Sequence, residues 1–121
     1  MKNLVYVVDD EQICLVPMQA LISAFGYECQ VFSDGESLLG QMKDEGHVLV
    51  LADMRMPNMN GLQLFERLRN AGFQCPFVLV SGHADSETVD HAFEIGVNGF
   101  LPKPFEPEEL QEVIERHLGP I

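Results

Sequence analysis

Residues 48–61 read VLVLADMRMPNMNG and contain the most informative junction of the chain. Four apolar residues and Ala52 lead directly into a carboxylate, Asp53, and a segment rich in turn-forming residues follows. An uninterrupted apolar run is typical of a strand that is buried on both faces of a parallel sheet. A charge at the end of such a strand costs free energy unless another group pairs with it. The rest of the chain must therefore supply a partner for Asp53.

The composition limits the class of protein. The 121 residues fit one domain, residues 1–121, and 46% of them are hydrophobic, which is enough for a substantial core. The chain has 7 basic and 19 acidic residues and a net charge of −12, so we expect no direct binding of nucleic acid or of anionic membranes. We expect a cytoplasmic protein, because no apolar run is long enough to cross a bilayer and the chain opens without a signal-peptide pattern. The thiols of Cys14, Cys29 and Cys75 lack metal-binding spacing, and we expect them to be reduced and to fill the core or its margin.

Apolar runs and helical patterns alternate along the chain. We expect strands at Leu4–Val8, Tyr27–Phe32, Val48–Ala52, Phe77–Val80 and Gly99–Leu101, with apolar residues at helical spacing in the segments that follow each of them. In the first such segment the spacing predicts a buried face formed by Ile13, Val16, Ala20, Leu21 and Ala24. Pro17 lies within this segment and lacks a backbone N–H, which predicts a late helix start or a kink.

Residues at the expected boundaries agree with this division. Residues 33–36 read SDGE, a capping box that would open the second helix, and Asn60 can cap the third. Pro107 suits the first position of the last helix. Glycines follow four of the helical segments, where a left-handed closing residue is expected: Gly26, Gly72, Gly96 and Gly119.

Five strand–helix units predict an α/β fold. The expected structure is a doubly wound, flavodoxin-like (βα)5 parallel sheet with helices on both faces and, if the second strand lies at the edge, strand order 2-1-3-4-5. In such folds ligands bind beyond the carboxyl ends of the strands. That edge of the sheet is therefore the place to look for functional side chains.

The second expected strand runs into Ser33 and Asp34 with no comparable cluster, and the candidate site residues follow the other four expected strands. They are Asp9 and Asp10 after the first strand, Asp53 after the third, Ser81 after the fourth and Lys103 after the fifth. Three carboxylates in one pocket raise each other's pKa unless a cation relieves them, and Mg²⁺ prefers oxygen ligands of this kind. A phosphoryl group could bridge the metal, Lys103 and the Ser81 hydroxyl, and Asp53 could accept it as a carboxylate nucleophile.

Each of these residues also has an ordinary structural interpretation. Asp9, Asp10 and Glu11 could simply cap the first helix. Asp53 alone could begin a turn, and Lys103 alone could be a surface lysine. The joint pattern, with complementary charge at one edge of the sheet, favours a functional site.

Four stretches together resemble the receiver domain of two-component response regulators: VVDDE, LADMRMPNMNG, VSGHAD and GFLPKPF. The resemblance covers essentially the whole chain. It is nearest to the nitrogen-fixation type of receiver, which usually precedes a helix-turn-helix DNA-binding domain.

The resemblance implies a role for each residue at the edge of the sheet. Asp53 is expected to be the phosphoacceptor, and Asp9, Asp10, Asp53 and the backbone carbonyl of Arg55 are expected to bind Mg²⁺ (or Mn²⁺). Ser81 and Lys103 are expected to bind the phosphoryl oxygens, with a cis peptide between Lys103 and Pro104. Phe100 would be the aromatic switch residue, and Arg55 and His83 occupy positions that tend to tune dephosphorylation.

The resemblance also implies a mechanism and partners. A sensor histidine kinase is expected to phosphorylate Asp53, and the domain would act as a switch and not as an enzyme on other substrates. Phosphorylation would change the surface of the helix ending at Gly96, the strand Gly99–Leu101 and the helix from Pro107, which would control an output domain or a homodimer. The function expected is transcription regulation; a stand-alone receiver that acts by protein contact, as in chemotaxis or a phosphorelay, is the alternative.

Two rivals belong to other functional classes. A haloacid dehalogenase-type phosphatase requires a second Asp two residues after its nucleophile and places that nucleophile after its first core strand, whereas here Arg55 follows and Asp53 ends the third strand. A flavodoxin-like cofactor binder requires a first loop rich in Ser, Thr and Gly, but Asp9, Asp10 and Glu11 would repel a phosphate.

Overall fold

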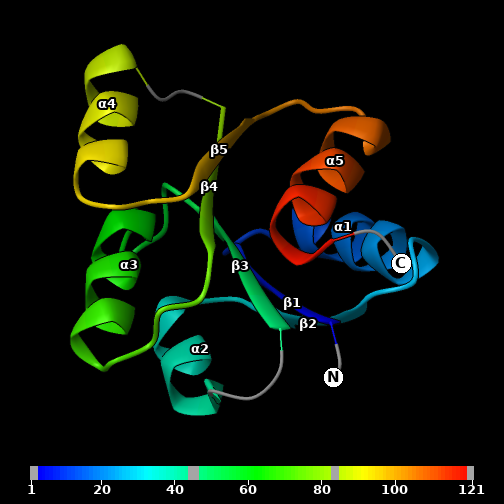
Figure 1. Cartoon of the computed structure of the whole chain (residues 1–121), viewed down its shortest axis with the longest axis horizontal. Helices are drawn as coiled ribbons and strands as arrows, with labels where there is room; N and C mark the ends of the chain where they lie inside the picture. Colours follow the sequence, from blue (N-terminus) through cyan, green and yellow to red (C-terminus); the bar gives the residue numbers. More distant parts are fainter. Residues whose placement is uncertain (1–2, 44–46, 83–84, 120–121) are drawn as a thin grey trace.

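The computed structural model describes residues 3–43, 47–82 and 85–119, and it contains a five-stranded parallel sheet (Figure 1). The strands are β1 (Asn3–Val8), β2 (Glu28–Phe32), β3 (His47–Asp53), β4 (Phe77–Ser81) and β5 (Gly99–Pro102). The helices are α1 (Gln12–Ala24), α2 (Gly35–Gln41), α3 (Gly61–Asn70), α4 (Ser86–Glu94) and α5 (Pro107–Leu118). The strand order is β2-β1-β3-β4-β5, so the predicted fold class and topology are confirmed.

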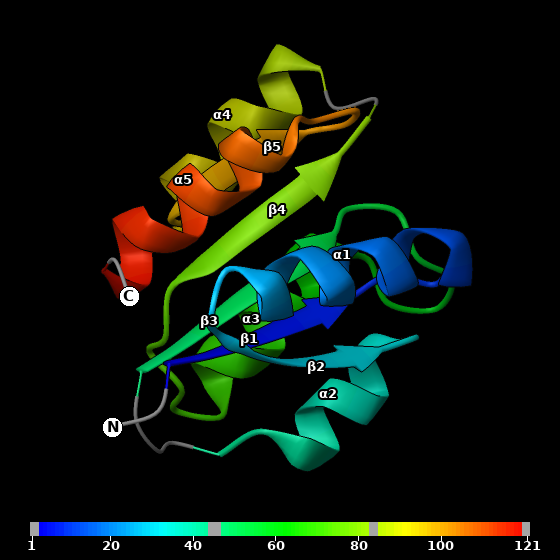
Figure 2. The same cartoon turned by 90° about the vertical axis from the view of Figure 1, so that its right-hand side faces the viewer.

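Helices cover both faces of the sheet. α1 and α5 pack on one face, and α2, α3 and α4 pack on the other (Figures 1 and 2). Successive residues of a strand point to opposite faces, so Val5 and Val7 join the core beneath α1 and α5, whereas Tyr6 and Val8 join the core beneath α2 to α4. β3 lies in the middle of the sheet and is buried along its length except at its first residue, as its continuous apolar run predicts.

Most predicted boundary residues are where the sequence places them. Asn60 caps α3 by accepting the N–H of Gln63 at 2.8 Å, while the Gln63 side chain accepts the N–H of Asn60. Pro107 is the first residue of α5, and the four predicted closing glycines have positive φ. The box at residues 33–36 is wrong by one position, because Asp34 and not Ser33 caps α2, accepting the N–H of Ser37 at 2.7 Å. The Asp34 side chain reaches the N–H of Ser37 and therefore takes the N-cap position that was predicted for Ser33.

α1 departs from the sequence-based prediction in two ways. For Pro17 the sequence predicts a late helix start or a kink; the helix begins at Gln12, so the late start is wrong, and Pro17 lies inside the helix. Its buried residues are Leu15, Met18 and Ile22, whereas Ile13 is 79% exposed and Val16 is 62% exposed. Apolar residues surround this helix, so spacing alone cannot identify the face that meets the sheet.

Packing against the sheet therefore buries a different stripe of α1 from the one predicted. Of the five residues expected on the buried face, only Leu21 packs against the core. The three cysteines are reduced and partly buried. Cys29 and Cys75 pack against the two cores, as expected, and burial raises the pKa of Cys29 to about 11.

Candidate functional site

The carboxyl edge of the sheet brings together the ends of β1, β3, β4 and β5. β1 and β3 are hydrogen-bonded neighbours, with Val8 opposite Ala52, so Asp9 and Asp53 leave the sheet side by side. Ser81 ends β4 opposite Pro102 of β5, which places Lys103 next to it. Asp9, Asp53 and Ser81 are the buried polar residues of the part of the chain described, with 2%, 8% and 3% exposure. The sheet therefore concentrates the predicted site residues in one place.

Lys103 is the cation that faces these carboxylates. Its Nζ lies 2.9 Å from Oδ2 of Asp9 and 3.5 Å from Oδ1 of Asp53. Its own N–H donates to the carbonyl of Ser81 at 2.9 Å, and the Lys103–Pro104 peptide is cis, as expected. Asp9 also accepts the N–H of Glu11 at 3.0 Å through Oδ1. The partner that the buried carboxylate of Asp53 requires is thus supplied by Lys103.

One lysine does not fully offset the acidic groups. Burial raises the pKa of Asp53 above its usual value, Lys103 lowers it, and the negative charges of Asp9 and Asp10 raise it again. Burial alone would lower the pKa of Lys103, but its hydrogen bond to Asp9 and the charge of Asp53 outweigh that effect and raise the pKa. The site is therefore short of positive charge while Asp53 is ionised.

The residues present fit a hard divalent cation. Asp9, Asp10 and Asp53 each offer a carboxylate oxygen, and these oxygens lie within 4.8 Å of one another. No other group of three or more ligating His, Cys, Asp or Glu side chains occurs in the described segments. Two of the three aspartates are buried and Asp10 is exposed, so a bound ion would keep open positions toward solvent. An all-oxygen set with an open side suits Mg²⁺.

The loop after β3 is anchored close to the sheet. The N–H of Met54 donates to Val80 at 3.0 Å, and the N–H of Gly61 donates to Met54 at 3.0 Å. A Cβ on Gly61 would lie 2.8 Å from the carbonyl oxygen of Asp53 and 2.5 Å from a methyl group of Leu79. Only glycine at this position allows α3 to begin so close to Asp53. The sequence indicated only that a helix starts here, not that the start requires glycine.

Two hollows open beside Asp53. The smaller, of about 530 Å³, lies between the loop after β3 and the start of α4, and Arg55, Asn60 and Thr88 line it. The larger, of about 950 Å³, contains Asp53 and Lys103 and extends along α1. Ser81 and Arg55 line both hollows. Asp10 also lines both hollows, whereas Asp53 lines only the larger one.

The remaining predicted residues lie around this centre. Arg55 is exposed at the mouth of both hollows. Phe100 lies on β5 opposite Leu79, is partly buried and packs against the core beneath α2 to α4. His83 lies outside the described residues.

Sequence reasoning missed Cys14 as a neighbour of the site. Its Sγ lies 3.9 Å from Nζ of Lys103, and burial raises its pKa although Lys103 opposes the shift. The sequence also did not reveal that apolar residues of α1 form a wall of the larger hollow, namely Ile13, Pro17, Met18 and Leu21. Both depend on how α1 rests on the sheet, and no local motif indicates either.

Comparison with known proteins assigns the family. The model of the response regulator receiver domain matches residues 5–115. The chain is 28% identical to the DNA-binding transcriptional regulator NtrC of Salmonella typhimurium, and the match covers 98% of this chain and 25% of that protein. It is 29% identical to the transcriptional regulatory protein FixJ of Bradyrhizobium diazoefficiens, and the match covers 94% of this chain and 56% of that protein. It thus spans a quarter to about half the length of these relatives.

Solved structures agree with the family assignment. The response regulator StyR superposes with a TM-score of 0.89 at 34% identity, over 98% of this chain and 60% of that one. No helix among the described residues is long and apolar enough to cross a bilayer. Receiver domains are regulatory phosphoacceptors that histidine kinases phosphorylate and that generally bind Mg²⁺ at an acidic pocket. With the sheet order, the acidic edge and the matched residues in agreement, the chain belongs to the response regulator receiver domain family.

Proposed function

We propose that residues 1–121 form one phosphorylation-dependent switch in which Asp53 accepts a phosphoryl group from a sensor histidine kinase. The observation that carries this proposal is the placement of Asp53, which is buried at the end of β3 with Nζ of Lys103 3.5 Å away and two further carboxylates within 4.8 Å. A buried carboxylate that faces an ammonium and a candidate cation site can act as a nucleophile toward an anionic phosphoryl group.

Each residue has a distinct role in this proposal. Asp9, Asp10, Asp53 and the backbone carbonyl of Arg55 hold Mg²⁺ or Mn²⁺, which supplies neutralisation of the charge on the transferring phosphoryl group. A carboxylate oxygen of Asp53 attacks phosphorus, and the bond from phosphorus to the imidazole nitrogen of the donor breaks. Lys103 and the Ser81 hydroxyl bind the phosphoryl oxygens, while Arg55 and His83 govern the access of water and so the lifetime of the acyl phosphate.

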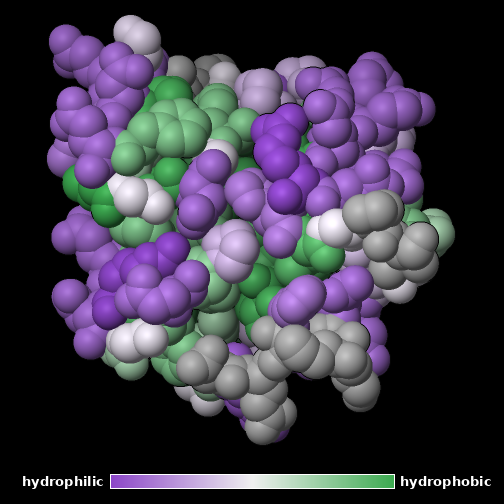
Figure 3. Space-filling view, viewed as in Figure 1, coloured by the Kyte–Doolittle hydropathy of each residue, from purple (hydrophilic) through white to green (hydrophobic). Residues whose placement is uncertain are grey.

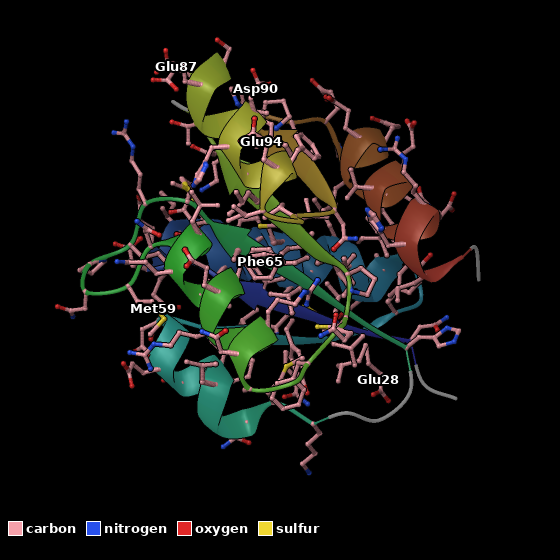
Figure 4. The ribbon with its side chains drawn as sticks, turned by 60° about the vertical axis from the view of Figure 1, so that its left-hand side comes forward. Glu28, Met59, Phe65, Glu87, Asp90 and Glu94 are labelled. Atoms are coloured by element: carbon pink, nitrogen blue, oxygen red, sulfur yellow. The ribbon has the colours of Figure 1, made fainter. Side chains whose placement is uncertain are left out.

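The signal then passes to the α4–β5–α5 surface. Ser81 moves toward the phosphoryl group, Phe100 turns inward, and α4 shifts relative to β5. The outward side chains of α4 include Glu87, Asp90 and Glu94 (Figure 4). In Figure 3, hydrophilic residues cover the outer side of α4 and hydrophobic ones gather between α4 and the sheet. A phosphorylation-dependent homodimer through α4–β5–α5 therefore uses the hydrophobic residues between α4 and the sheet, because the acidic outer side chains of α4 in two copies repel each other.

The output in this proposal is transcription regulation in the cytoplasm. NtrC and FixJ are named as transcriptional regulators and are both longer than this chain, which favours a separate output domain for DNA contact. The net charge of −12 also favours a separate domain for DNA contact, because this acidic domain is repelled by the phosphate backbone of DNA. A stand-alone receiver that acts by protein contact is the second candidate, supported by the exposed Phe93 on α4.

The test is phosphorylation of the purified chain by a histidine kinase with ATP and Mg²⁺, followed by intact-mass spectrometry. We expect one added phosphoryl group, lost in Asp53→Asn and retained in Asp90→Asn, which removes an exposed acid on α4 as a matched control. Normal phosphorylation of Asp53→Asn would overturn the assignment of the phosphoacceptor. Turnover of a phosphomonoester by the wild type would instead revive the phosphatase alternative.

A further inference from the structure

α1 differs in charge from the rest of this acidic domain. The chain has 7 basic and 19 acidic residues, yet residues 12–27 read QICLVPMQALISAFGY and contain no Asp, Glu, Lys or Arg. Each of the other four helices in the described segments contains at least one acidic residue. Three large apolar side chains are exposed in those segments, and two of them, Ile13 and Val16, belong to α1. The outer side of α1 is therefore both uncharged and apolar.

The exposed apolar residues of α1 form one continuous stripe, called here the outer stripe. At about 100° per residue, its positions lie within about 100° of one another around the helix. They are Ile13, Val16, Pro17, Ala20 and Ala24, and all five are exposed. The buried residues of the same helix, Leu15, Met18 and Ile22, lie on the opposite side. In Figure 2, α1 lies in front of the sheet and no other helix covers its outer side. The fold thus packs one apolar face of α1 against the sheet and leaves the other in solvent.

Side-chain size changes along the outer stripe. The bulky residues Ile13 and Val16 lie in the first half of the helix. The small residues Ala20 and Ala24 lie in the second half. When two copies of one surface meet about a two-fold axis, a contact from residue i to residue j is always accompanied by the contact from j to i.

An antiparallel pair of α1 helices makes these sizes complementary. A two-fold axis near the middle of the helix sets Ile13 against Ala24 of the second copy. The same axis sets Val16 against Ala20, so a bulky side chain faces a small one at each level. Close packing between helices favours this alternation of large and small residues. The outer stripe is therefore complementary in shape to a second copy of itself.

The charges beyond the ends of α1 favour the same arrangement. Glu11 precedes the helix, and Glu28 is the first charged residue after it. The pairing that sets Ile13 against Ala24 also sets Glu11 of one copy against Gly26 of the other, so no two acidic side chains face each other along the stripe. Approach through the other four helices meets repulsion, because each carries acidic residues and each copy has a net charge of −12.

We propose that the outer stripe of α1 is a self-association surface at which two copies of this chain pair antiparallel about a two-fold axis. This dimer involves neither Asp53 nor the α4–β5–α5 surface, so it forms without phosphorylation. A helix of 13 residues is about 20 Å long, and one stripe of it buries much less than the roughly 800 Å² per partner of a standard interface. The dimer is therefore weak and forms at high protein concentration.

Sedimentation equilibrium of the full, unphosphorylated chain tests this proposal. At protein concentrations from about 10 μM to about 1 mM, a range suited to a small interface, the apparent mass should rise from that of one chain toward that of two. High salt should strengthen the association, because it screens the repulsion between two chains of net charge −12. Weakening by salt would show an interface held by ion pairs and would overturn the proposal.

A charge in the outer stripe should abolish the dimer. Ala20→Glu places a carboxylate in the contact in both copies, where it would be buried without a partner. Gln41→Glu is the matched control, because it adds the same charge at an exposed position of α2, on the other face of the sheet, and the dimer should persist. Thermal unfolding checks that both variants fold, as their exposed positions predict. Equal loss of the dimer in the two variants would assign the effect to net charge and overturn the proposal.

Exchanging side-chain sizes tests the antiparallel pairing itself. Val16→Ala should weaken the dimer by about fourfold for each completely buried methyl group that is lost, and by less where burial is partial. Ala20→Val should weaken it through steric overlap. The double variant again sets a bulky residue against a small one and should recover most of the association. Additive losses in the double variant would overturn the proposed pairing.

Two further outcomes would overturn the proposal. A chain that stays monomeric at every protein and salt concentration would leave the outer stripe to a helix of a different protein. A dimer that persists in Ala20→Glu but is lost in Phe93→Ala, which changes an exposed residue of α4, would belong to the α4–β5–α5 surface instead.

Discussion

The two edges of the sheet use polar groups in opposite ways. At the amino edge, neutral groups close the fold with paired hydrogen bonds: the Tyr27 hydroxyl donates to the carbonyl of Gly119 at 2.9 Å, and the Asn98 side chain accepts the N–H of Phe77 at 2.9 Å. At the carboxyl edge, Asp9, Asp10 and Asp53 form an acidic cluster, and the ammonium group of Lys103 lies within 3.5 Å of Asp9 and Asp53.

This difference separates stability from function within one sheet. The hydrogen bonds of Tyr27 and Asn98 at the amino edge join separate segments of the chain, so they stabilise the domain. The carboxyl edge keeps an excess of negative charge close to the point where β1 and β3 end, which favours a cation and then a phosphoryl group. Perturbing the amino edge should therefore change the free energy of unfolding, and perturbing the carboxyl edge should change its dependence on ligand.

The largest effect is expected from Phe77→Ala at the amino edge. Phe77 begins β4, is fully buried and packs edge to face on Phe65 with ring centroids 5.3 Å apart. Removing the ring should lower the free energy of unfolding by about 3–5 kcal/mol in urea denaturation. Phe93→Ala is the control, since that ring is 48% exposed and its loss should cost less than about 0.5 kcal/mol. Equal losses in the two variants would contradict the assignment of Phe77 to the core.

The second largest effect is an increase in the free energy of unfolding when Mg²⁺ binds at the carboxyl edge. At 100 times its dissociation constant, a ligand that binds only the folded domain raises the free energy of unfolding by about 2.7 kcal/mol. The gain should shrink in Asp10→Asn, whose exposed side chain contributes little to folding, and should persist in Asp90→Asn. Thermal unfolding at constant ionic strength measures it. A gain of equal size in Asp10→Asn would show that the ion binds elsewhere.

Asn98→Ala should have the next largest effect and act at the amino edge alone. Its Oδ1 accepts the N–H of Phe77 at 2.9 Å and faces Nη2 of Arg69 at 3.4 Å. Loss of this acceptor should cost about 1–2 kcal/mol, because the N–H of Phe77 loses its partner. Asn98→Asp keeps an acceptor in place and should cost less, while the stabilisation by Mg²⁺ stays the same in both variants. A loss of Mg²⁺ binding in Asn98→Ala would show that the two edges are coupled.

The smallest effect concerns pH at the amino edge. Burial lowers the pKa of His117 from 6.5, and the neighbouring Arg116 lowers it further. The folded state therefore binds a proton at His117 less readily than the unfolded state, so stability is full above pH 6.5 and falls as the pH drops through that value. His117→Gln should flatten this decline in stability, measured by urea titrations between about pH 7 and 5. The variant leaves unchanged the other charged or titratable side chains that line the same hollow, Lys43 and His47. The change should be small because solvent screens this partly buried ring. An unchanged decline would assign the pH dependence to other groups.

Local sequence patterns were enough to predict the order of strands and helices and most of the site. Continuous apolar runs identified the buried strands, and their carboxyl ends pointed to Asp9, Asp53, Ser81 and Lys103 as neighbours. These inferences succeed because strand direction and sheet order place residues that are far apart in the chain at one edge, whatever the details of packing. Asn60 and Pro107 were likewise identifiable because capping depends on local backbone groups.

Which side of α1 faces the sheet depends on packing between elements. Apolar residues lie all around that helix, so spacing predicted Ile13 and Val16 as buried, and contact with the sheet instead selected Leu15, Met18 and Ile22. The same contact brought Cys14 to Lys103 and created the apolar wall beside Asp53. The close approach that requires Gly61 also depends on two elements meeting. Contacts between separate elements follow from shape and packing, which no local pattern encodes.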